Sequence, residues 1–125
     1  MKNSELLSLL GLARRASQLS LGHDAVLESI ASKETRLILL ACDLSERTKK
    51  NLFAVAEKAH IELIPIDASM EDLEKSIGKK SGIISVNESG FAAKLKVLAN
   101  QKQEHTLAVD IESDRKAMGR NEMIW

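Results

Sequence analysis

The chain is short of cysteine, of aromatic residues and of net charge, and each shortage excludes a class of protein. Cys42 is the only cysteine, so neither an internal disulfide nor a metal site built from several thiolates can form. Eighteen basic residues balance eighteen acidic ones, whereas a protein that binds DNA without sequence preference normally carries a basic excess. With two phenylalanines, one tryptophan and no tyrosine, the core must be aliphatic.

Long apolar runs are also missing. The longest, at residues 37–42, is far too short to span a bilayer, and we expect no signal peptide. Together with the single cysteine, this predicts a soluble cytoplasmic protein without membrane contact. The 125 residues suffice for one domain with its own core. We expect that domain at residues 1–100 and a C-terminal extension at 101–125, which is either a flexible tail or a short strand or helix docked on the body.

Helical and strand-like patterns alternate along the body of the chain. The helical patterns cover residues 4–15, 22–31, 43–60, 69–78 and 87–100, and the strand-like patterns cover 17–21, 36–42, 61–67 and 82–86. Such alternation is typical of an α/β protein and predicts a three-layer α/β/α sandwich. The unbroken aliphatic run at 36–42 indicates a strand covered on both faces. Pro65 places its strand at an edge of the sheet.

Capping signals mark several helix ends. Ser69 with Asp72 has the spacing of a capping box, and Gly78 is a helix stop. For the 43–60 helix, either Asp43 or Ser45 serves as the cap, and Asp43 also has capping-box spacing to Glu46. His60 ends that helix, where an imidazole suits the helix dipole. The expected buried stripe of this helix is Leu52, Phe53, Val55, Ala56 and Ala59.

Little in the chain predicts catalysis. There is no glycine-rich phosphate-binding motif, and His23, His60 and His105 are isolated, without the spacing that would put two ligands on one helical face. Cys42 closes an aliphatic strand and has no neighbour that would activate it, so we expect a buried structural thiol. We therefore expect no enzyme, no cofactor and no metal site.

Binding of an anion is better supported. The loops at 21–24 and 86–90 each lead from a strand into a helix, and a helix N-terminus presents unpaired N–H groups that attract anions. A third loop, GKKSG at 78–82, adds the cations of Lys79 and Lys80. The alternative is that these are ordinary capped helix starts without a ligand.

Three segments together carry a specific resemblance: LLGLARRASQLSLGHDAVLESI, RLILLACDLSERTKKNL and LEKSIGKKSGIISVNESGFAAKL. With their spacing they resemble the YlxQ-type bacterial branch of the L-seven-Ae ribosomal protein family, over roughly residues 4–98. The resemblance implies an α/β/α sandwich with a mixed four-stranded sheet. It also implies binding of kink-turn or other structured RNA, with ribosomal RNA among the candidates. The implied contacts are the N-terminus of the helix at Gly22 and the adjacent loop after the last strand.

The first implied contact departs from the family pattern. Kink-turn binders of this family read G-[AT]-N-[EK]-x-x-K, and of these positions only Gly22 matches. The departing residues are His23, Asp24, Ala25 and Glu28. An ionised aspartate only accepts hydrogen bonds where asparagine both donates and accepts, and acidic side chains repel phosphates. One lost bidentate base contact costs about 1–3 kcal/mol, so we expect altered recognition.

In the second implied contact, Val86, Asn87, Glu88 and Ser89, only Val86 keeps the apolar character expected of the family. Cations and hydrogen-bond donors that could compensate are Arg36, Lys79, Lys80 and His23. The sequence thus predicts a non-enzymatic RNA-binding protein with an altered recognition motif. The alternative is a protein-interaction module that kept the fold but lost RNA binding, with self-association through residues 101–125.

Overall fold

The computed structural model describes residues 4–111, and the side chains of residues 4–100. Along the chain the elements are α1 (Ser4–Arg15), β1 (Leu19–Leu21), α2 (His23–Ala31), β2 (Leu37–Leu40), α3 (Glu46–Ala59), β3 (Leu63–Pro65), α4 (Met70–Ile77), β4 (Ile83–Val86) and α5 (Ser89–Ile111). The predicted alternation of helices and strands is therefore confirmed. None of the helices in the described part combines the length and apolar character needed to cross a membrane.

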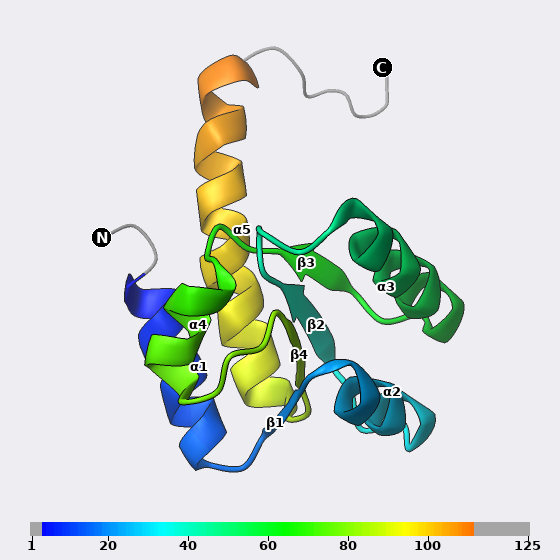
Figure 1. Ribbon diagram of the computed structural model, residues 1–125. Helices are drawn as coiled ribbons and strands as arrows, with labels where there is room; N and C mark the ends of the chain where they lie inside the picture. Colours follow the sequence, from blue (N-terminus) through cyan, green and yellow to red (C-terminus); the bar gives the residue numbers. More distant parts are fainter. Residues whose placement is uncertain (1–3, 112–125) are drawn as a thin grey trace.

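The four strands form one mixed sheet in the order β1-β4-β2-β3. β2 and β3 are parallel, and β4 runs antiparallel to both β1 and β2. Helices α2 and α3 lie on one face of the sheet, and α1, α4 and α5 lie on the other (Figure 1). The expected three-layer α/β/α sandwich with a mixed four-stranded sheet is confirmed, and Pro65 lies in an edge strand as predicted.

The core has two parts, one on each face of the sheet. Successive strand side chains point to opposite faces, so Leu39 packs with the cluster under α1, α4 and α5, while Ile38 and Leu40 pack with the cluster under α2 and α3. All four residues of β2 are buried. This explains the unbroken aliphatic run, because a strand covered on both faces has no polar side.

Most of the observed helix caps agree with those predicted from the sequence. Ser69 and Asp72 form the predicted capping box, and Gly78 ends α4 in the left-handed region with φ 82°. His60 is the C-cap of α3. Ser45 is the N-cap of α3, because its hydroxyl accepts a hydrogen bond from the Thr48 N–H at 3.1 Å.

Three local expectations are wrong. Asp43 makes no capping box with Glu46, because its carboxylate instead accepts a hydrogen bond from the Met70 N–H at 3.0 Å. Cys42 is exposed, since β2 already ends at Leu40. Phe53 is 44% exposed and lies outside the buried stripe of α3.

The last helix continues past the body. The boundary expected at residue 100 falls inside α5, which runs without a break to Ile111. Figure 1 shows the second half of α5 projecting beyond the rest of the molecule. The other part of the expected C-terminal extension, residues 112–125, lies outside the described residues.

Candidate functional site

The start of α2 is an uncapped helix N-terminus. Gly22 occupies the N-cap position with φ 94° and ψ 161°, a conformation that L side chains rarely adopt. Having no side chain, Gly22 gives the first turn of α2 no capping acceptor. The first N–H groups of a helix lack intrahelical acceptors. The amides around His23 and Asp24, both exposed residues, can therefore bind an external acceptor.

Acidic side chains surround this helix start. His23 Nδ1 lies 3.7 Å from Asp24 Oδ1, and the Asp24 side chain is fully exposed. Glu28, one turn further along α2, is also exposed, whereas Ala25 is partly buried. The carboxylate of Asp24 suits the positive end of the helix dipole, so it stabilises α2 while opposing the approach of an anion.

The 78–82 loop lies at the same end of the sheet as the start of α2. The Gly22 N–H donates a hydrogen bond to the carbonyl oxygen of Ile83 at 2.9 Å, and Leu21 pairs with Ile84. The loop leads directly into this part of β4, with Lys79 and Lys80 exposed on it. The structure thus brings the two lysines to the end of the sheet that carries Gly22, His23 and Asp24, here called the Gly22 end.

The loop after β4 lies at the opposite end. Val86 pairs with Leu19 and Leu37, three residues or about 10 Å along the strand from Ile83. The Arg36 N–H donates to the Val86 carbonyl oxygen at 2.8 Å, so Arg36 belongs here too. We call this the Val86 end, and it also carries Asn87, Glu88 and Ser89. The expected adjacency of the two loops is wrong, because β4 runs antiparallel to β1 and only its beginning lies beside Gly22.

The Asn87 side chain belongs to a polar hydrogen-bond network between α2 and the sheet. Its Nδ2 donates to Ser20 Oγ at 2.9 Å, and its Oδ1 accepts from Ser85 Oγ at 2.9 Å. The hydroxyls of Ser20 and Ser29 share a hydrogen bond of 2.5 Å. Ser85 and Ser29 are buried. The only sequence signal of this network is a serine inside the otherwise aliphatic strand GIISV, and it does not reveal the partners.

Glu88 caps α5. Its carboxylate accepts a hydrogen bond from the Phe91 N–H at 2.7 Å. The backbone N–H groups of Phe91 and then Gly90 stabilise the ionised form and lower the pKa of Glu88. Ser89 is the first residue of this helix. At the Val86 end, Asn87 and Glu88 therefore have structural roles.

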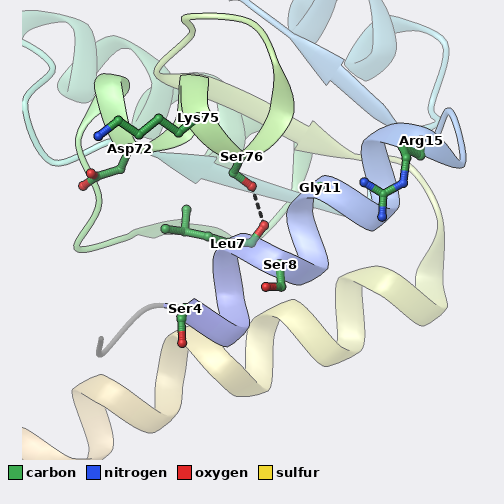
Figure 2. Close-up of a pocket in the computed structure, with 8 residues that line it drawn as sticks. All are labelled: Ser4, Leu7, Ser8, Gly11, Arg15, Asp72, Lys75 and Ser76. Atoms are coloured by element: carbon green, nitrogen blue, oxygen red, sulfur yellow. Dashed lines mark hydrogen bonds between the residues drawn. The ribbon is translucent and has the colours of Figure 1, made fainter.

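A groove of about 560 Å³ lies along the contact between α1 and α4 (Figure 2), which are on the face of the sheet opposite α2 (Figure 1). Gly11 permits this close packing, because a Cβ there would lie 2.9 Å from the Ser76 carbonyl oxygen. Ser76 Oγ donates to the Leu7 carbonyl oxygen. In Figure 2, Arg15 and Lys75 project at opposite ends of the groove. Because their charges do not converge on one point, we assign this groove no ligand.

Metal binding has no support from the described side chains. Within that part of the chain, no three His, Cys, Asp or Glu side chains come together to hold an ion. At the Gly22 end, the helix start without a side-chain cap and the two exposed lysines form a surface whose chemistry suits an anion.

Comparisons with known proteins agree with this fold. Residues 4–96 match the model of the ribosomal protein L7Ae/L30e/S12e/Gadd45 family. The RNA-binding protein YlxQ of Bacillus subtilis (strain 168) is 36% identical over 98 residues, which cover 76% of this chain and 95% of the relative. The RNA-binding protein YlxQ of Enterococcus faecium is 31% identical over 94 residues, covering 74% and 88%.

Two solved structures have a similar fold. A protein of unknown function from Bacillus halodurans C superposes with a TM-score of 0.73 at 33% identity, covering 78% of this chain and 98% of that one. The Giardia lamblia 15.5kD RNA binding protein superposes with a TM-score of 0.64 over 80% of this chain and 86% of that one. At 14% identity the second comparison shows the fold alone. The chain belongs to the ribosomal protein L7Ae/L30e/S12e/Gadd45 family and, within it, is of the YlxQ type.

Proposed function

We propose that this protein is a non-enzymatic, cytoplasmic RNA-binding protein that binds structured RNA at the Gly22 end of its sheet. The observation that carries the proposal is the uncapped start of α2 beside the loop of Lys79 and Lys80. The names of the two YlxQ relatives support RNA as the anion. Ribosomal RNA is the first candidate, because the family is one of ribosomal proteins.

The Gly22 end offers two kinds of contact to an RNA backbone. Backbone N–H groups in the first turn of α2 donate to phosphate oxygens, helped by a helix dipole equivalent to roughly half a positive charge. Lys79 and Lys80 neutralise phosphates and release condensed counterions. Both contacts are sequence-independent, so they provide affinity and register while leaving the choice of base to other groups.

Asp24 and Glu28 make the recognition different from that of a usual kink-turn binder. Their exposed carboxylates accept hydrogen bonds from exocyclic amino groups such as cytosine N4 but repel phosphates. The interface we propose contains Gly22, His23, Lys79 and Lys80, with Asp24, Ala25 and Glu28 selecting against the usual RNA. Arg36 and the 86–89 segment belong to the Val86 end and lie outside it.

The test is a binding titration over a series of salt concentrations against a panel of structured RNAs, including a kink-turn and ribosomal RNA fragments. Lys79→Ala with Lys80→Ala should weaken binding and reduce the slope of log K against log salt by about 1.4–1.8. The matched control is Lys50→Ala with Lys58→Ala, which removes two exposed lysines from α3. Absent or salt-independent binding, or an equal loss in the control, would contradict the proposal.

The alternative function, a protein-interaction module, has one observation in its favour. The second half of α5 projects beyond the body of the molecule (Figure 1). Self-association through residues 101–125 would make the sedimentation coefficient of the full chain rise with protein concentration. A chain that sediments as a monomer at all concentrations and binds RNA would exclude self-association in favour of the function proposed above.

A further inference from the structure

A second groove lies along the contact between α1 and α5. Its volume is about 370 Å³, and its lining residues are Ser4, Glu5, Ser8, Leu9, Leu12, Lys94 and Leu98. Three leucines form the apolar part of this α1–α5 groove, and Glu5 and Lys94 supply one charge of each sign. Helices α1 and α5 lie on the face of the sheet opposite α2 (Figure 1), so an occupant of the groove would leave the Gly22 end free.

The apolar surface of this region is not covered by the described residues. Three large hydrophobic side chains among them are exposed, and two of the three, Leu12 at 47% and Val97 at 55%, belong to α1 and α5. Leu9 and Leu98 are only partly buried, although both also pack against the core. Leu12, Leu9 and Leu98 all line the groove, and exposed apolar side chains gathered in one groove are typical of a surface that has a partner.

The chain carries a matching apolar segment beyond α5. Residues 112–125 are mostly polar until Met123, Ile124 and Trp125, and Trp125 is the only tryptophan. This segment lies beyond residues 4–96, which match the family model. A tryptophan provides a large apolar area together with one N–H that needs an acceptor. The groove offers leucines for the first and the Ser8 hydroxyl or the Glu5 carboxylate for the second.

The segment is long enough to reach the groove. From Leu98 to Ile111, α5 advances about 20 Å at 1.5 Å per residue. The fourteen residues 112–125 span at most about 46–50 Å when extended. Residues 112–125 can therefore reach back from the end of α5 to the groove beside Leu98. Arg120 and Glu122 precede the apolar residues, and their charges are opposite to those of Glu5 and Lys94.

We propose that Met123, Ile124 and Trp125 dock in the α1–α5 groove of the same chain, with the Trp125 ring on Leu12 and Leu98. The occupant is intramolecular because the tether keeps it at high effective concentration near its groove. The docked segment covers the apolar surface of α1 and α5 that the described residues leave exposed.

Fluorescence of the full chain tests the docking. Trp125 is the only tryptophan and tyrosine is absent, so emission excited in the indole band reports on this residue alone. We expect emission shifted to the blue of that in denaturant, with a several-fold smaller acrylamide quenching constant. Leu12→Ser should move both values toward those in denaturant. The matched control, Phe53→Ser, removes an exposed apolar side chain on α3 and should leave both unchanged.

A second measurement does not depend on the folding of a groove variant. In the full chain, Trp125→Ala should remove ring-current shifts from the methyl groups of Leu9, Leu12 and Leu98, while Leu52 under α3 stays unchanged. The shifts should be independent of protein concentration. Denaturant-like emission from the wild-type chain, unchanged groove methyls, or shifts that grow with concentration and so place Trp125 on a second copy, would each overturn the proposal.

Discussion

The backbone N–H of Gly22 donates to the carbonyl oxygen of Ile83 at 2.9 Å, which joins the start of α2 to the start of β4. This hydrogen bond lies where the antiparallel pairing of β1 with β4 brings the start of β4 beside the helix N-terminus. Because the 78–82 loop leads into Ile83, its lysines share the Gly22 end. The loop after Val86 lies one strand length away.

Replacing Gly22 tests whether its backbone conformation builds the site. Gly22→Asn should lower the free energy of unfolding by about 1–3 kcal/mol, because φ 94° with ψ 161° is open essentially only to glycine. Space is no obstacle, since a Cβ there meets nothing within 4 Å. Urea denaturation measures the loss, and RNA titration of the folded variant should show weaker binding.

The matched control is Gly78→Asn, at φ 82° and ψ 4° in the left-handed region that asparagine tolerates. Its loss of stability should be clearly smaller than that of Gly22→Asn. Equal losses at the two positions would mean that the conformation of Gly22 is not the cause.

Asn87 separates a structural role from an RNA contact. Asn87→Ala leaves the buried hydroxyl of Ser85 and the hydroxyl of Ser20 without their amide partner. We expect a loss of about 1–3 kcal/mol in the free energy of unfolding, which is the cost of unpaired buried polar groups. The control Asn51→Ala, on the exposed side of α3, should stay within about 0.5 kcal/mol. A variant of full stability with weakened RNA binding would reverse the assignment.

Much of the fold could be predicted because its signals are local. The Ser69–Asp72 capping box and the stop at Gly78 depend on residues within one or two turns. The aliphatic run of β2 and the proline of β3 reveal burial and an edge position for the same reason. The prediction for Phe53 is wrong because helical periodicity gives the direction of a stripe but not its width, and the buried residues of α3 are Leu52 and Ala56.

The site could be predicted only in part because its arrangement is not local. The sequence predicts a helix start at Gly22 and exposed loop cations at Lys79 and Lys80. Which loop lies beside Gly22 depends on the direction of β4, which is set by pairing with strands more than forty residues away in sequence. The side chain of Asp43 likewise bonds a backbone amide 27 residues away, at Met70, which no short-range pattern contains.

Glu88 gives the fold a dependence on pH. Because hydrogen bonds from Phe91 and Gly90 lower its folded-state pKa below the ordinary value of 4.5, the carboxylate stabilises the native chain above that value. The stabilisation is lost as the pH falls from 4.5 through the lower folded-state pKa. Glu88→Gln should therefore unfold at a lower temperature than the wild type at neutral pH, with the difference shrinking below pH 4.5. A difference in melting temperature that stays constant over this range would contradict the capping role.

The two carboxylates of α2 provide the sharpest test of altered recognition. Asp24→Asn restores a donor, and Glu28→Lys replaces a repelling charge with a phosphate-binding one. We expect the double variant to bind a kink-turn RNA more tightly than the wild type. Its slope of log K against log salt should grow by about 0.7–0.9 for the added phosphate contact. Stability should fall slightly, by about 0.3–1 kcal/mol, because Asp24 no longer complements the helix dipole.

Glu57→Lys, a matched charge change on the exposed side of α3, should leave the affinity nearly unchanged. Since Gly22 and its uncapped amides remain in place in all these variants, unchanged kink-turn affinity in the double variant would show that the carboxylates do not determine the choice of RNA.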